Sequence, residues 1–426
     1  MSAMNSTVIS IPNEDGASTE KKKRFQSFLL SLLPCLGGKK SIHGYKKLIH
    51  SVKVGIALVL VSLLYLLNPL YKQVGENAMW AIMTVVVIFE FYTGAMLSKG
   101  LNRGVGTILG GGFGCLAAIL AHEVGGIGKA ITVGISVFIF GAAATYSRLI
   151  PSVKKRYDYG VMIFILTFNL VAVSGLRAEA VIEIARERLS TIAMGFAVCL
   201  FTSLFIFPMW ASDELHYSTA SKFNNLASFI EGSLEEYFKE MGTEKKENQS
   251  TTSFIGCTSV LYSKIKDESL ANFARWEPWH GKFGFSHPWY KYLQIGDSLR
   301  ELAASIISLK GCLQSHRQPQ SVAVRMTIKE PCEAVALSLI CTLRELGDSI
   351  KGMKRCSPKV LLVAKLQLMR LELSVASSPS RLVLENCDGL AMASFVYVLM
   401  EMVDKVEKLA QEVEELAHLA GFPSDQ

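Results

Sequence analysis

Six apolar stretches in the first half of this 426-residue chain constrain its fold more than any other feature. A helix needs roughly 20 predominantly apolar residues to cross the hydrocarbon core of a bilayer. Each stretch meets that length within the usual range, so we predict six membrane-spanning helices. The predicted spans run from Leu48 to Leu67, Ala78 to Leu97, Gly104 to Ala121, Ala130 to Tyr146, Gly160 to Leu176 and Leu189 to Trp210.

The chain after Trp210 has a different character. It contains no uninterrupted apolar run long enough to span a bilayer, and its apolar residues recur with helical spacing, as at Leu299, Leu302 and Ile306. We therefore predict an all-α protein with three parts: a cytosolic N-terminal segment (1–47), a transmembrane domain with six helices (48–210) and a cytosolic helical domain (211–426). The apolar stripe of 402–419 is compatible with packing against a second subunit and with packing inside its own domain.

The distribution of basic residues predicts the orientation. Nine Lys and Arg residues stand among the first 53 residues. The predicted inside loops add six, including Lys99 and Arg103, against five in the outside loops. Cytosolic loops of membrane proteins carry the basic excess, so both termini are expected in the cytosol. This charge pattern indicates an anionic leaflet and not a nucleic-acid partner.

No pattern of catalysis, metal binding or cofactor binding is visible. The nine cysteines are scattered without a CxxC pair, which favours a reducing cytosol over a disulfide framework. His280 and His287 lack a third ligand at suitable spacing. The glycines between Gly104 and Gly114 lack a following GK[ST], so we interpret them as small residues that let membrane helices approach closely. We expect no enzyme activity, no metal and no cofactor.

Arg188 is the most informative charge in the predicted spans. A single helix from about Ala178 to Phe207 places Arg186 and Arg188 about 200° apart, on nearly opposite faces. Arg186 has Glu183 within reach, whereas the neighbours of Arg188 on its own face carry no carboxylate. A guanidinium near the membrane needs water, a partner or a mobile anion. The alternative is an arginine that snorkels to the outer headgroups.

Two further pairs of charges deserve a hypothesis. Lys99 and Arg103 share a helix face if that segment is helical, and an anion between them would offset their repulsion. The alternative is that they are ordinary topology charges on the cytosolic side.

Glu179 and Glu183 form an acidic pair at the predicted outer face, where carboxylates suit hard cations. The default interpretation is that these carboxylates only solvate the helix. Glu90, inside the second span, needs a cation or a hydroxyl nearby, and we assign it to structure or gating.

Several motifs together carry a resemblance to a known family. They are WAIMTVVVIFEFYTGAMLSKGLNRGVGT (80–107), YDYGVMIFILTFNL (157–170), RERLST (186–191) and WEPWHGKFGFSHPW (276–289). From about Ile49 to about Cys312 the chain resembles the plant aluminium-activated malate transporters, a family of anion channels. We expect the last motif to pack Trp276, Trp279, Phe283 and Trp289 as a turn that locks the cytosolic helices.

The resemblance implies a channel for malate, with other organic or inorganic anions as further permeants, that assembles as a homodimer. It implies that Arg188 is a pore arginine, and we expect Arg188 outside and Lys99 and Arg103 inside to form the anion pathway. It suggests Glu179 and Glu183 as a candidate external cation site. We expect the plasma membrane in preference to the vacuolar membrane. The alternative function is an ion-coupled secondary carrier of organic or aromatic acids.

Overall fold

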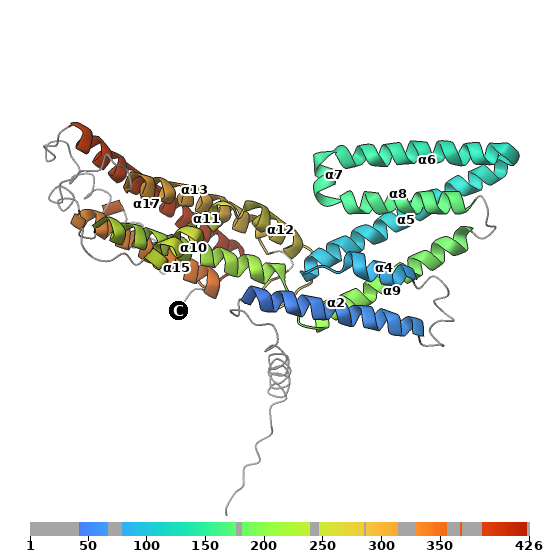
Figure 1. Ribbon diagram of the computed structural model, residues 1–426, viewed down its shortest axis with the longest axis horizontal. Helices are drawn as coiled ribbons and strands as arrows, with labels where there is room; N and C mark the ends of the chain where they lie inside the picture. The colour runs from blue at the N-terminus through green and yellow to red at the C-terminus, as the bar shows by residue number, and fades with distance from the viewer. Residues whose placement is uncertain are drawn as a thin grey trace, which may run out of the picture. The chain divides into compact units, whose positions relative to one another are not determined.

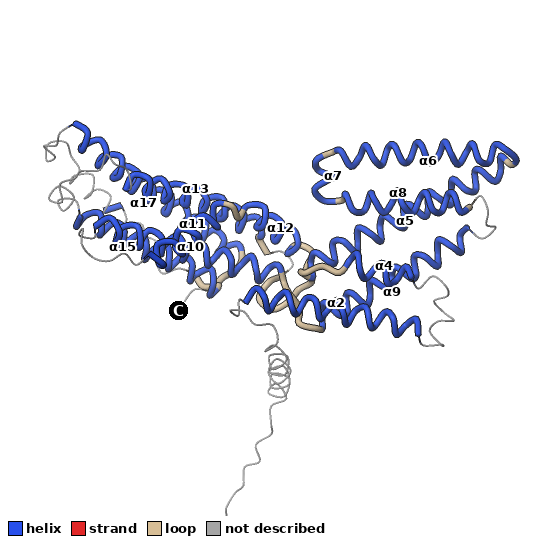
Figure 2. Tube along the Cα trace, in the orientation of Figure 1, coloured by secondary structure: helices blue, strands red, loops and turns tan. Residues whose placement is uncertain are grey.

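The computed structural model describes residues 42–66, 79–175, 181–238, 247–284, 287–313, 329–355, 367–368 and 386–423. Within these ranges the regular structure is helical, apart from one isolated bridge between His280 and Phe283. Figure 2 shows this all-helical trace, and it confirms the predicted all-α fold. The chain divides into two units, 1–52 and 53–426. The structure describes only the start of helix α2 in the first unit, so the predicted N-terminal segment lies mostly outside the described residues.

The apolar half of the chain forms seven helices in the described ranges. They are α2 (Ile42–Leu66), α4 (Met79–Ile88), α5 (Thr93–Val124), α6 (Gly126–Leu149), α7 (Pro151–Arg156), α8 (Asp158–Ser174) and α9 (Val181–Phe205). Three helical stretches of the described residues are long and apolar enough to cross a membrane, namely α5, α6 and Arg186–Phe205 of α9. Helices α4 and α8 are apolar but shorter. These lengths support a membrane protein without confirming all six predicted spans.

The boundary between the second and third predicted spans is wrong. Helix α4 already ends at Ile88, and α5 then runs without interruption from Thr93 to Val124. Lys99 and Arg103 therefore lie inside a helix and not in a loop. The break precedes Thr93 because distant groups hold that residue: its amide donates to the Met209 carbonyl at 3.1 Å and its hydroxyl lies 3.1 Å from the Ser203 hydroxyl. Hydropathy alone contains no signal for such contacts.

Glycines hold α5 and α8 close together, as the sequence predicts. An added Cβ atom at Gly110 would lie 2.7 Å from the Phe164 carbonyl oxygen, and one at Gly114 would lie 2.9 Å from the Val171 Cβ. Contact positions increase together along both helices, so α5 and α8 run parallel, side by side (Figure 1). Because small residues let helix backbones approach closely, this stripe sets the spacing of the two helices.

The polar half forms six helices in the described ranges. They are α10 (Ala211–Phe238), α11 (Glu247–Leu261), α12 (Lys264–Ala274), α13 (Trp289–Leu313), α15 (Lys329–Gly352) and α17 (Asn386–Leu419). Their apolar faces share one core. The stripe of α17, including Leu399, Val406 and Leu416, is buried in that core. Of the two alternatives for this stripe, the structure thus favours packing inside its own domain.

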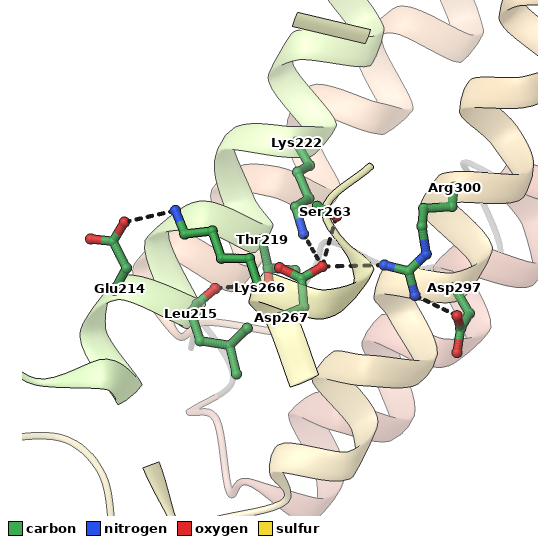
Figure 3. Close-up of polar contacts among 9 residues, drawn as sticks. All are labelled: Glu214, Leu215, Thr219, Lys222, Ser263, Lys266, Asp267, Asp297 and Arg300. Carbon is green, nitrogen blue, oxygen red and sulfur yellow. Dashed lines mark hydrogen bonds and ion pairs between the residues drawn. The ribbon is translucent and has the colours of Figure 1, made fainter. Parts of the chain in front are cut away.

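A buried ionic cluster ties three of these helices together (Figure 3). The Asp267 side chain of α12 is 1% exposed, and its Oδ2 atom accepts from Lys222 Nζ of α10 at 2.5 Å and from Arg300 Nη1 of α13 at 3.2 Å. The Ser263 hydroxyl donates to the same oxygen at 2.8 Å. Burial lowers the pKa of Lys222, while Asp267 acts in the opposite direction. The carboxylate therefore fixes the relative positions of α10, α12 and α13.

Candidate functional site

Two buried arginines, one on α5 and one on α9, lie near enough for their charges to interact. These helices are antiparallel, because Thr93 contacts Ser203 while Gly100, further along α5, packs on Phe196, earlier in α9. This arrangement brings Arg103, 5% exposed, near Arg188, 3% exposed, so that their charges act on one another. The sequence interpretation had placed the two arginines at opposite ends of the pathway. The structure brings them into one site.

Arg188 is held by an aromatic ring and not by a carboxylate. Its guanidinium carbon lies 3.9 Å from the centroid of the Trp80 ring of α4, a cation–π contact. The Nε and Nη1 atoms of Arg188 are buried and have no hydrogen-bond partner in the described part of the chain. The contact stabilises the flat face of the guanidinium, whereas Nε and Nη1 on its edge have no partner among the described residues.

Arg103 is positioned from the other side. Its Nη1 donates to the hydroxyl of Tyr159, on α8, at 3.0 Å, and its buried Nε has no partner among the described residues. Tyr159 reaches Arg103 because α8 runs alongside α5 in the glycine-spaced contact. One turn further along α5, the buried Thr107 hydroxyl is likewise unpaired within the described ranges. Among the described residues, the site therefore presents unpaired hydrogen-bond donors and no carboxylate that pairs with them.

Lys99 does not join this site. Its ammonium forms an ion pair with Glu90, and both side chains are about a third exposed or more. The lysine is thus neutralised locally, whereas the two arginines are not neutralised by any carboxylate in the described residues. The cation that Glu90 requires is Lys99, from the first turns of α5.

The site has the charge and the hydrogen-bond donors that an anion would require. Two like charges in a water-poor environment repel each other and lose hydration. Three buried guanidinium nitrogens, Arg103 Nε and Arg188 Nε and Nη1, have no protein acceptor in the described residues. A carboxylate that enters the site offsets both costs, since charge-assisted hydrogen bonds are among the stronger ones. Nothing in the arrangement activates a nucleophile or moves a proton.

Sequence reasoning does not identify Trp80 or Tyr159 as part of this site. It identifies Arg188, but not the residues that Arg188 contacts. Trp80 and Tyr159 both lie in the quoted motifs, but no spacing rule connects either to an arginine on another helix. Arg188 was singled out correctly as lacking a local carboxylate.

The candidate cation site stays a prediction. Glu179 lies outside the described residues, and of Glu183 only the backbone is described. Within the described residues no group of three His, Cys, Asp or Glu side chains could hold a metal ion.

The segment with the two histidines is only partly as expected. Phe283 and Trp289 are buried in the core of the polar half, and His287 packs on the Trp289 ring. Trp279, expected to pack with them, is instead exposed. The sequence motif contains no signal that separates the outward-facing tryptophan from the inward-facing ones.

Comparison with known proteins gives one consistent result. Residues 43–386 match the family model described as aluminium activated malate transporter. Similar proteins include aluminum-activated malate transporter 12 of Arabidopsis thaliana, 46% identical over 317 residues that cover 74% of this chain and 56% of that protein. Aluminum-activated malate transporter 14 of the same plant is 46% identical over 316 residues, covering 73% and 58%. Aluminum-activated malate transporter 2 is 41% identical over 382 residues, covering 88% and 76%. The matched part thus spans little more than half the length of the first two relatives.

Proposed function

Because the chain belongs to the aluminium activated malate transporter family, we propose that it is a membrane channel that conducts malate and other small organic or inorganic anions. The observation that carries this proposal is the pair of buried arginines, of which three nitrogens lack a hydrogen-bond partner in the described residues. A dicarboxylate supplies the negative charge and the hydrogen-bond acceptors that these arginines lack.

Arg103 and Arg188 act in this proposal as the selectivity site. They replace part of the hydration of a carboxylate as the anion leaves bulk water. The Trp80 ring and the Tyr159 hydroxyl hold the guanidinium groups in place when no anion is bound. An inside-negative potential drives a dianion outward with about twice 2.3 kcal/mol per 100 mV. Lys99, which the sequence also suggested for the pathway, is paired with Glu90 and has no part in this selectivity site.

The helix directions support six membrane crossings. We infer that α2, α4, α5, α6, α8 and α9 cross in alternating directions, with both termini in the cytosol. In such an arrangement the third crossing (α5) and the fifth (α8) run in the same direction, and the sixth (α9) runs in the opposite direction. This fits the structure, in which α5 is parallel to α8 and antiparallel to α9. The domain division at residue 210, a homodimer and a plasma-membrane location are further parts of this proposal.

A voltage clamp of cells expressing the chain and loaded with malate tests the selectivity site. A charge-assisted hydrogen bond contributes roughly 1.5–3 kcal/mol, so Arg188→Ala and Arg103→Ala should each raise the half-saturating malate concentration about ten- to a hundredfold. Arg186→Ala is the matched control, because Arg186 stands two residues away on α9 and is exposed. Equal currents from all three variants at equal surface expression would refute the site.

The external cation site is proposed at Glu179 and Glu183. The relatives are named for activation by aluminium, and carboxylate oxygens suit hard cations. Addition of external aluminium should increase the malate current of the wild type and leave a Glu179→Gln/Glu183→Gln variant unchanged. A response that survives in the variant places any cation site elsewhere.

A further inference from the structure

A tight turn in the polar half presents an exposed tryptophan. The Phe283 amide donates to the His280 carbonyl at 3.2 Å, and Gly281 has a φ of 53°. This left-handed conformation suits glycine and allows the sharp reversal. Trp279 precedes the turn and is 67% exposed. A single exposed aromatic side chain is common on protein surfaces, so what Trp279 contacts must be argued from its surroundings.

Side-chain contacts on both sides of Trp279 anchor the turn to the start of α10. The His280 ring stacks on the Trp210 ring with centroids 3.7 Å apart, and its Nε2 atom lies 3.1 Å from the Ser212 hydroxyl oxygen. The buried Glu277 carboxylate accepts the amides of Ala211 at 2.6 Å and Ser212 at 3.2 Å, at the first residues of α10. Burial raises the pKa of Glu277, which these hydrogen bonds counteract.

The turn and the preceding helix α12 lie near the ends of two candidate membrane helices. Trp210, under His280, follows the end of α9 at Phe205 by five residues, and the Phe205 side chain is exposed. At the start of α5, a Cβ atom on Gly94 would collide with the Phe273 carbonyl oxygen of α12. If α5 and α9 cross a bilayer, these ends lie at its surface. The turn is therefore placed where the headgroups begin.

The charges around the tryptophan are basic. Arg275 and Lys282 are exposed, and neither forms an ion pair with another described residue. The segment from Arg275 to Gly284 has one acidic residue, Glu277, which is buried at the start of α10. Tryptophan with unpaired lysine or arginine is the usual composition of a segment in the headgroup region of a bilayer.

We propose that this turn inserts into the inner leaflet of the same membrane, with the Trp279 ring among the headgroups and with Arg275 and Lys282 on the phosphates of anionic lipids. The proposal rests on the proposed function in one respect, namely that α5 and α9 span the bilayer. It assigns the WEPWHGK part of the motif to lipid contact, in addition to the packing role of Phe283 and Trp289.

Quenching by brominated phospholipids tests the position of the ring. The full chain, which has five tryptophans, is placed in nanodiscs whose lipids carry bromine near the headgroup or deep in the acyl chain. The emission of Trp279 is the difference between the wild type and the Trp279→Phe variant. We expect this emission to be quenched strongly by the shallow bromines and weakly by the deep ones. Trp289→Phe is the control, because Trp289 is buried and its contribution should resist both.

Lipid charge tests the basic residues. Adding phosphatidylglycerol should increase shallow quenching of Trp279 in the wild type, and Arg275→Gln/Lys282→Gln should remove that increase. A Trp279 signal that no bromine quenches would overturn the proposal, and a new cross-link from Trp279→Cys to another protein would then identify a protein contact instead. Malate current measured on the same purified variants in planar bilayers of the same lipids separates the outcomes, since a normal current without quenching contradicts only the lipid contact.

Discussion

The Asp267 carboxylate neutralises the buried Lys222 and the partly buried Arg300, and its replacement by asparagine should strongly destabilise the polar half. Asparagine preserves the shape and the hydrogen bond from Ser263 but removes the negative charge. Arg300 keeps a second ion-pair partner in Asp297. Lys222 has Asp267 as its ion-pair partner and is buried with it (Figure 3), so its ammonium is left uncompensated.

The magnitude follows from the cost of an unpaired buried charge. Removing one partner of a buried ion pair costs about 3–5 kcal/mol. For a domain of about 150–250 residues each kcal/mol shifts the melting temperature by roughly 2–4 °C, so the expected loss is roughly 6–20 °C. Burial already lowers the pKa of Lys222, and the neutral amine avoids the penalty. The loss should therefore be larger in mildly acidic buffer and smaller in alkaline buffer.

Thermal unfolding of the full chain in nanodiscs, followed by tryptophan fluorescence, measures this loss. Asp297→Asn is the control, because Asp297 is exposed and an exposed pair contributes about 0–1 kcal/mol. A Lys222→Met/Asp267→Leu variant, which removes both charges, should recover most of the lost stability. If the Asp267→Asn and Asp297→Asn variants have the same melting temperature, the Asp267 carboxylate does not hold these helices together and the reasoning fails.

Two further predictions concern packing and pH. Gly110→Ala should destabilise the chain, because overpacking against the Phe164 carbonyl costs about 1–3 kcal/mol. Gly112 has open space around it, so Gly112→Ala should raise the free energy of unfolding by up to about 1 kcal/mol through helix propensity. Equal melting temperatures of the two variants would contradict the close contact. Burial holds the pKa of His287 at about 4, below its ordinary value of about 6.5, so the unfolded chain binds more protons between these values and stability should fall as pH drops through that window. His287→Phe should flatten this fall in thermal scans near neutrality and at about pH 5, and an unchanged slope would assign the titration to another group.

Much of the fold could be predicted from the sequence because it depends on local patterns. Apolar length and helical spacing report the all-α class and the division between an apolar and a polar half. The glycine stripe likewise predicts a close helix contact, which Gly110 and Gly114 make. The break before Thr93 could not be predicted in this way, because it depends on the carbonyl of Met209, more than a hundred residues later in the chain. Long-range hydrogen bonds leave no periodic signal.

The candidate site shows the same limit. Arg188 stood out because its neighbours on the helix lack a carboxylate, and that local argument remains consistent with the structure. Its proximity to Arg103 depends on the antiparallel crossing of α5 and α9, which no spacing rule contains. Lys99 looked equivalent to Arg103 four residues away, yet Glu90, just before α5, neutralises it. Charge patterns identify candidate residues, and only the packing of helices decides which candidates act together.

The most direct test of the account is the reversal potential of the purified, reconstituted chain in a malate gradient at constant pH. A channel for the dianion predicts a shift of about 30 mV for each tenfold change in malate concentration, since the driving force is shared by two charges. The same shift should persist when a proton gradient is imposed. A reversal potential that instead follows the proton gradient, or another counter-ion, would show coupled transport and contradict the channel.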